Sequence, residues 1–222
     1  DADAEDDASR LRASFSTPGH AASVRCCAAQ GRLCATGGAD DAVRVFDLRT
    51  RRDKGTLVHH DGTVTCLAFH GRGGGRTAAA DYLVTGSSDG TLATWSASKG
   101  FERLAELSKG HAPGAGVAAV CVHPTGQMAL SAADDRGIAL WNMALGKPAY
   151  KGKLSSYACA PSFLRFTSDC EGYAGVAGAA AHFHAVERGE APLASADLSA
   201  DCARLLCADL AECSGGDVCL VG

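Results

Sequence analysis

The stretch Asp81-Tyr-Leu-Val-Thr-Gly-Ser-Ser-Asp-Gly-Thr-Leu-Ala-Thr-Trp95 decides the fold of this chain. Leu83 and Val84 predict a short apolar strand, residues 86–90 are rich in turn-forming side chains, and a second strand begins at Thr91. The segment therefore predicts a β-hairpin. Related segments occur twice more in the sequence, and a histidine precedes each of the three copies.

The three copies share one spacing around an aspartate in the turn. A threonine or serine lies four residues before the aspartate, and a large aromatic residue lies six residues after it. The aspartates are 49 and 46 residues apart, and the longer interval contains an apparent insertion at residues 71–80. The four positions in each copy are His20, Thr36, Asp40 and Phe46; His60, Thr85, Asp89 and Trp95; and His111, Ser131, Asp135 and Trp141.

This pattern resembles the WD40 repeat, whose period is roughly 40 to 45 residues and whose units are four-stranded propeller blades. The Gly-His pair of that repeat is present before the first and third copies but becomes His59-His60 in the second. The resemblance implies an all-β propeller in which Asp, His, Ser or Thr and Trp form a buried chain of hydrogen bonds. Phe46 has no N–H to donate, so Thr36 needs another partner.

The repeat divides the chain into an acidic tail and a partial propeller. Residues 1–10 carry five carboxylates among the first seven positions and predict a disordered tail, and residues 11–16 alternate like a half-buried strand. A closed ring of seven blades needs roughly 300 residues at this period. We therefore expect an incomplete propeller of about four and a half blades within residues 11–222, a fragment of a longer protein. The expected blades are 19–58, 59–109, 110–154 and 155–198, with a truncated fifth at 199–222.

The composition is that of an ordinary globular protein, with 46% hydrophobic and 21% charged residues among 222. A formal net charge of −4 provides no global positive field for nucleic acid. Eleven cysteines include no C-x-x-C pair, so we expect buried, reduced thiols and a reducing compartment. No signal peptide or apolar run of membrane-spanning length is evident, and we expect no membrane contact.

Two local patterns are candidates for binding. The basic residues Arg49, Arg51, Arg52 and Lys54 lie within six positions and could meet phosphate oxygens of RNA, although the more ordinary explanation is an exposed, solvated loop. His182 and His184 share one face of a predicted strand at a spacing that a metal could bridge. No third ligand is evident, so no metal site is expected.

A hydrolase is the enzymatic alternative, because His60, Thr85 and Asp89 have the residue types of a catalytic triad. The same set recurs at the same spacing in three successive units, whereas an active site is normally built once. An aromatic residue recurs with it, and nucleophilic chemistry has no need of one. The sequence also lacks a phosphate-binding loop and an H-E-x-x-H helix. We therefore expect no enzyme activity, cofactor or small-molecule substrate.

A narrower resemblance appears in three places: residues 55–67, residues 123–131, and Trp141-Asn142 followed by Gly146-Lys147. These segments resemble the p21-activated kinase-interacting protein 1 family, whose fungal members are nucleolar assembly factors of the large ribosomal subunit. The resemblance implies a non-enzymatic scaffold in the nucleus and nucleolus. It would bind pre-ribosomal large-subunit proteins and support large-subunit rRNA maturation, with any rRNA contact at the basic segment. The alternative is a negative regulator that binds a p21-activated protein kinase.

Overall fold

The computed structural model describes residues 19–71, 79–167, 170–186, 192–197, 209–212 and 218–221. In this part of the chain all helices and strands longer than one residue are β-strands. The prediction of an all-β fold is therefore confirmed. Consequently no described helix is long and apolar enough to cross a membrane. The predicted acidic tail, the strand at residues 11–16 and most of the insertion after Gly71 lie outside the described residues.

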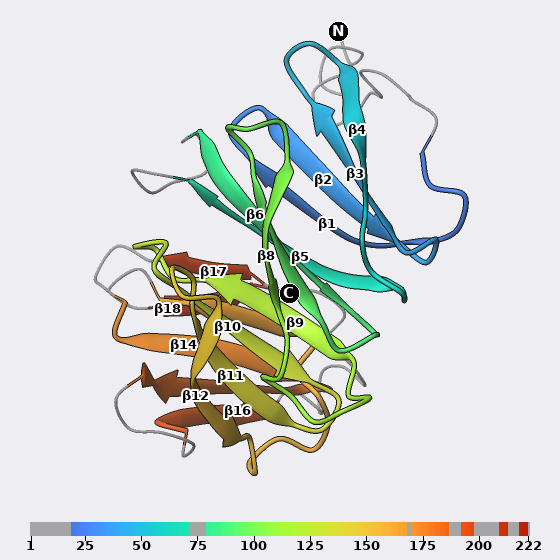
Figure 1. Cartoon of the computed structure of the whole chain (residues 1–222). Helices are drawn as coiled ribbons and strands as arrows, with labels where there is room; N and C mark the ends of the chain where they lie inside the picture. The colour runs from blue at the N-terminus through green and yellow to red at the C-terminus, as the bar shows by residue number, and fades with distance from the viewer. Residues whose placement is uncertain are drawn as a thin grey trace, which may run out of the picture.

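Sixteen of the strands form four antiparallel sheets of four strands each, in chain order within each sheet (Figure 1). The first two sheets consist of β1 Val24–Gln30, β2 Leu33–Gly38, β3 Ala42–Asp47 and β4 Arg52–Val58; and β5 Val64–Gly71, β6 Ala80–Ser87, β7 Leu92–Ser96 and β8 Glu102–Leu107. The next two consist of β9 Val117–Val122, β10 Met128–Ala133, β11 Gly137–Asn142 and β12 Lys147–Lys153; and β13 Phe163–Phe166, β14 Gly172–Ala177, β15 Ala180–Ala185 and β16 Ala194–Asp197.

The sheets are arranged as successive blades, with one strand of each next to the following sheet. β1 lies beside β5, β5 beside β9, and β9 beside β13, so these first strands form the inner row. A separate apolar core fills each space between neighbouring blades. The core between the first two blades includes Leu33, Val45, Leu83 and Phe101. Because each blade buries its faces against its neighbours, the stability of one blade depends on the next.

A further hairpin follows the fourth blade and consists of β17 Asp209–Glu212 and β18 Val218–Val221. This hairpin lies within residues 199–222, where a truncated fifth blade is expected, and the residues before β17 in that range lie outside the described part of the chain.

The basic segment of the first blade corrects one expectation. We expected Arg49, Arg51, Arg52 and Lys54 in an exposed loop, but β4 begins at Arg52. Asp47 Oδ1 accepts hydrogen bonds from the backbone N–H groups of Arg49 and Thr50, both at 3.0 Å. Arg51 then closes the turn with a positive φ of 54°. The turn is therefore complete at residue 51, and Arg52 and Lys54 belong to the outer strand.

Candidate functional site

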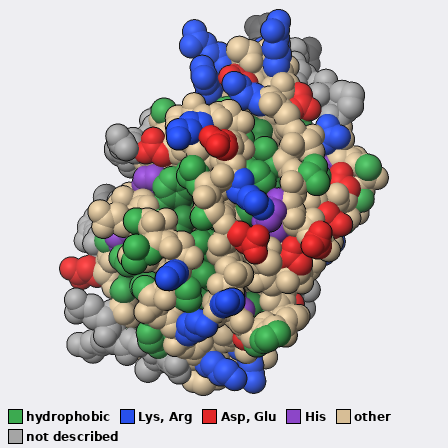
Figure 2. Space-filling view, in the orientation of Figure 1, with side chains coloured by type: hydrophobic (Ala, Val, Ile, Leu, Met, Phe, Trp, Pro, Cys, Tyr) green, Lys and Arg blue, Asp and Glu red, His purple; other side chains and the backbone are tan. Residues whose placement is uncertain are grey.

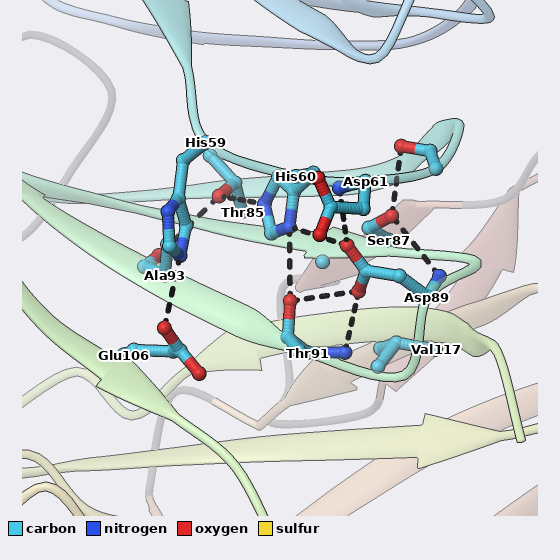
Figure 3. A network of polar contacts seen from close by, with 12 residues as sticks. His59, His60, Asp61, Thr85, Ser87, Asp89, Thr91, Ala93, Glu106 and Val117 are labelled. Atoms are coloured by element: carbon cyan, nitrogen blue, oxygen red, sulfur yellow. Dashed lines mark hydrogen bonds and ion pairs between the residues drawn. The ribbon is translucent and has the colours of Figure 1, made fainter. Parts of the chain in front are cut away.

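The second blade contains the most connected polar network of the three copies (Figure 3). His60 Nε2 lies 2.7 Å from the Thr85 hydroxyl oxygen, which also accepts a hydrogen bond from the Trp95 indole N–H at 3.1 Å. On the other side of the ring, His60 Nδ1 lies 3.1 Å from the Thr91 hydroxyl and 3.4 Å from Asp89 Oδ2. The Thr91 hydroxyl donates to Asp89 Oδ1 at 2.7 Å. Thr91 therefore relays the contact between aspartate and histidine.

The sequence analysis did not identify Thr91 as part of this network. Its position two residues after the turn aspartate is a signal, because a hydroxyl there can bond the carboxylate. The corresponding residues in the other copies are Ala42 and Gly137, which have no hydroxyl. The relay is consequently a feature of the second blade alone among the three.

The third blade has the same contacts among histidine, hydroxyl and indole, but its aspartate lies farther from the histidine. Ser131 Oγ lies 2.7 Å from His111 Nε2 and accepts a hydrogen bond from the Trp141 indole N–H at 2.8 Å. His111 Nδ1 lies 3.9 Å from Asp135 Oδ1 and is buried without a hydrogen-bond partner. Asp135 instead accepts from the backbone N–H groups of Ala112 and Gly137.

In the first blade, the copy without a tryptophan, the aspartate and histidine are closest. His20 Nδ1 lies 2.7 Å from Asp40 Oδ1, and His20 Nε2 lies 2.8 Å from Thr36 Oγ1 and 3.2 Å from the Thr36 carbonyl oxygen. Phe46 is buried and contributes only apolar contact. The first network therefore joins three of its four residues through hydrogen bonds.

The charge states fit a structural network. Burial lowers the pKa of His60 and His111, although nearby Asp89 and Asp135 act in the opposite direction. Burial raises the pKa of Asp89, but hydrogen bonds from the Thr91 hydroxyl and nearby backbone N–H groups outweigh it and leave that pKa below its ordinary value. The two imidazoles are thus neutral at pH 7, and the aspartate is ionised.

The same geometry argues against nucleophilic catalysis at these positions. Thr85 and Ser131 would be the nucleophiles, yet both have a relative exposure of 0%. A substrate carbonyl must come within about 3–3.5 Å of a nucleophile to react. Both hydroxyls instead contact a histidine ring nitrogen and an indole N–H inside their blades, so these buried polar groups satisfy one another.

His59 occupies the position that is glycine in the Gly-His pair of the other two copies. A Cβ at Gly110 would lie 2.1 Å from the ring of Trp141, so glycine is needed there. His59 instead places its ring edge-on to Trp95, with centroids 6.1 Å apart. It also contacts Arg103 and Glu106 of β8, and its Nε2 lies 3.4 Å from the Glu106 carboxylate (Figure 3).

The fourth blade contains a substitute network that the sequence analysis missed. Strand pairing aligns Gly175 with Ser131 and His184 with Trp141, because Gly175 pairs with His182 as Ser131 pairs with Ala139. Tyr157 lies six residues before β13, as His111 lies six residues before β9. That shared spacing is the signal that could have identified it.

Tyr157 fills the space that the glycine leaves. A Cβ at Gly175 would lie 2.3 Å from the Tyr157 hydroxyl, which is 3.1 Å from His184 Nε2. The imidazole stacks on Tyr173 with ring centroids 4.9 Å apart, and burial lowers the pKa of His184 to about 4. Three coordinated changes therefore replace histidine, hydroxyl and indole.

His182 and His184, the pair considered as metal ligands, each contact a hydroxyl group of their own blade. His182 Nδ1 lies 2.8 Å from the Ser195 hydroxyl, and His184 Nε2 faces Tyr157. His184 Nδ1 is buried without a hydrogen-bond partner. Among the described residues, no group of three or more His, Cys, Asp or Glu side chains could hold a metal ion.

The basic segment of the first blade is exposed at one end of the molecule. Figure 2 shows Lys and Arg side chains gathered where Figure 1 places the β3–β4 turn. Within the described part of the chain, its four basic side chains make no ion pair, whereas Asp53 between them lies 3.5 Å from Arg44. The segment therefore presents uncompensated positive charge; its members are Arg49, Arg51, Arg52 and Lys54.

The hairpin turns of the first three blades separate charge between the two faces of the molecule. We call the face with the β1–β2, β3–β4 and β7–β8 turns the basic face; its described turns in these blades contain Arg32, Arg49, Arg51 and Lys99 and no acidic residue. The opposite, acidic face contains the β2–β3, β6–β7 and β10–β11 turns. Those turns contain Asp40, Asp41, Asp89, Asp134, Asp135 and a single base, Arg136.

This fold and its repeated network define a propeller protein of the WD40 class. The family described as "WD domain, G-beta repeat" matches residues 11–47, 51–96 and 101–142, and the chain belongs to it. A chain of the solved structure titled "Crystal Structure of Mitotic Checkpoint Complex" aligns with a TM-score of 0.65 over 79% of this chain and 53% of its own length. At 17% identity, that likeness concerns the fold.

Within this class, the chain is related to curated proteins that match more than half of its residues. It is 32% identical to "p21-activated protein kinase-interacting protein 1-like" of Xenopus laevis, over 62% of this chain and 35% of that protein. It is 30% identical to the protein of the same description from Gallus gallus, over 72% and 39%. "Protein MAK11" of Saccharomyces cerevisiae is 33% identical over 53% and 29%. The chain thus spans well under half the length of these relatives.

Proposed function

We propose that this chain belongs to a non-enzymatic scaffold in assembly of the large ribosomal subunit. It would act in the nucleus and nucleolus, join pre-ribosomal large-subunit proteins and support maturation of the large-subunit rRNA. The observation that carries the proposal is the separation of charge, with unpaired basic side chains on one face and acidic turns on the other. Two faces of opposite charge suit a protein that bridges different partners.

Two further observations support a scaffold over an enzyme. The hydroxyls that could act as nucleophiles are buried within the networks. The relation to MAK11 extends over 53% of the chain, and the relation to the Xenopus p21-activated protein kinase-interacting protein 1-like protein over 62%. The role in ribosome assembly follows from the resemblance found in residues 55–67 and 123–131. A propeller fold alone would not assign it.

Depletion of the protein from cells tests the proposal. Free large subunits should fall and large-subunit rRNA precursors should accumulate, while small-subunit levels hold. Rescue with a protein in which Arg49, Arg51, Arg52 and Lys54 are Ala should give weaker association with pre-ribosomal particles. The weakening should depend on salt, because phosphate contacts release counterions. Unchanged subunit ratios after depletion would contradict the proposal.

The second candidate is a regulatory protein that binds and inhibits a p21-activated protein kinase. The descriptions of the Xenopus and Gallus relatives favour it, since both are named for interaction with such a kinase. The same depletion distinguishes the two roles. If kinase activity rose while subunit ratios stayed constant, the regulatory function would replace the scaffold function.

A further inference from the structure

A groove of about 1010 Å³ opens on the basic face between the first two blades. Three hairpin turns, the outer strand β4 and the start of β6 contribute to its walls. Arg32 comes from the β1–β2 turn, Leu48 and Arg49 from the β3–β4 turn, Lys54 from β4, and Phe101 from the β7–β8 turn. These residues are far apart in the sequence, and the packing of two blades brings them together.

The floor of the groove is apolar. Leu33 and Phe101 line it and belong to the core between the two blades, where each has less than a tenth of its surface exposed. Leu48, at the rim, is 41% exposed. A concave apolar floor with a few polar groups around it is the usual form of a binding site in proteins.

The rim is positively charged and mostly unneutralised. Arg49 and Lys54 make no ion pair within the described part of the chain. Arg32 Nε lies 3.5 Å from Asp47 Oδ2, but 61% of the arginine side chain remains exposed. Asp81 is the one acidic residue among those that line the groove, and it already has a partner in the structure. The groove therefore complements a negatively charged ligand.

We propose that this groove binds an acidic peptide segment of a partner protein, with an apolar side chain flanked by carboxylates. The apolar side chain would rest on Leu48 and Phe101, and the carboxylates would pair with Arg49 and Lys54. The inference deepens the scaffold proposal, because it names the class of partner that the basic face recognises.

A peptide fits the groove better than RNA does. Proteins that hold single-stranded RNA usually stack its bases on exposed aromatic side chains. The one aromatic residue in this groove is Phe101, which is 6% exposed. Arg51 and Arg52 do not line the groove, so the basic segment divides into a groove-lining pair and an outer pair.

Fluorescence anisotropy with the full chain tests the inference. The probe is a short labelled peptide of Asp and Glu around a central Leu, and its competitors are the same peptide with Ser in place of Leu and a single-stranded RNA of equal charge. The double variant Arg49→Glu/Lys54→Glu should weaken peptide binding at least about tenfold, and Leu48→Ser should weaken it by a smaller factor. The matched control Arg51→Glu/Arg52→Glu makes the same change of charge outside the groove and should weaken binding less than about threefold.

Three outcomes would overturn the inference. They are equal weakening by the two double variants, equal affinity for the Leu and Ser peptides, and displacement of the Leu peptide by RNA at lower concentration than by unlabelled peptide. None of these readouts involves ribosomal subunits. The groove and the assembly role can therefore fail separately.

Discussion

The hydroxyl at the centre of each network differs between blades in the number of side chains that it contacts. Thr85 satisfies both His60 Nε2 and the Trp95 indole N–H, whereas Thr36 faces only His20. A buried polar group without a partner costs stability, so the two threonines should differ in importance.

The matched pair Thr85→Val and Thr36→Val tests this difference at constant shape. Thr85→Val leaves His60 Nε2 and the Trp95 indole N–H without their shared hydrogen-bond partner. It should lower the free energy of unfolding by about 1–3 kcal/mol. Thr36→Val should cost less, because the Thr36 hydroxyl serves one ring nitrogen, whereas the Thr85 hydroxyl serves a ring nitrogen and an indole N–H. Denaturant unfolding with unchanged m-values measures both. Equal losses would show that the indole contact contributes nothing.

At the scale of one blade, the hairpins could be predicted from the sequence, whereas features that depend on several distant positions could not. The spacing around Asp40, Asp89 and Asp135 located three hairpins, because turn chemistry and strand alternation act within a few residues. The fourth blade was expected at residues 155–198, but its polar network was missed because three positions had changed together. The groove was also hidden, because its walls come from separate hairpins whose approach depends on blade packing.

The substitute network of the fourth blade gives a prediction for that element. Tyr157→Phe removes only the hydroxyl that faces His184 Nε2 and should lower the free energy of unfolding by about 1–3 kcal/mol, since the imidazole is buried. Tyr150→Phe is the control, because Tyr150 lies 45% exposed on β12. Thermal or denaturant unfolding measures both variants. A Tyr157→Phe protein as stable as the control would mean that the hydroxyl has no structural role.

For the whole molecule, buried neutral histidines in successive blades link stability to pH. Burial lowers the pKa of His60, His111 and His184 below the ordinary value of 6.5. Below pH 6.5 the unfolded chain therefore binds more protons than the folded chain. The free energy of unfolding must then fall as the pH falls. The lowered carboxylate pKa of Asp89 acts only in more acidic solution, below about 3.8.

We therefore expect full stability above about pH 6.5 and a progressive loss from there towards pH 4, where His184 would complete its share. Urea unfolding at several pH values measures the loss, and NMR titration of the histidine ring protons assigns it. His184→Phe removes one titrating group and should flatten the dependence in this window while leaving the part due to His60 and His111. If the three rings titrated near 6.5 in the folded protein, or if stability were constant between pH 7 and 4, the buried networks could not be the source of acid sensitivity.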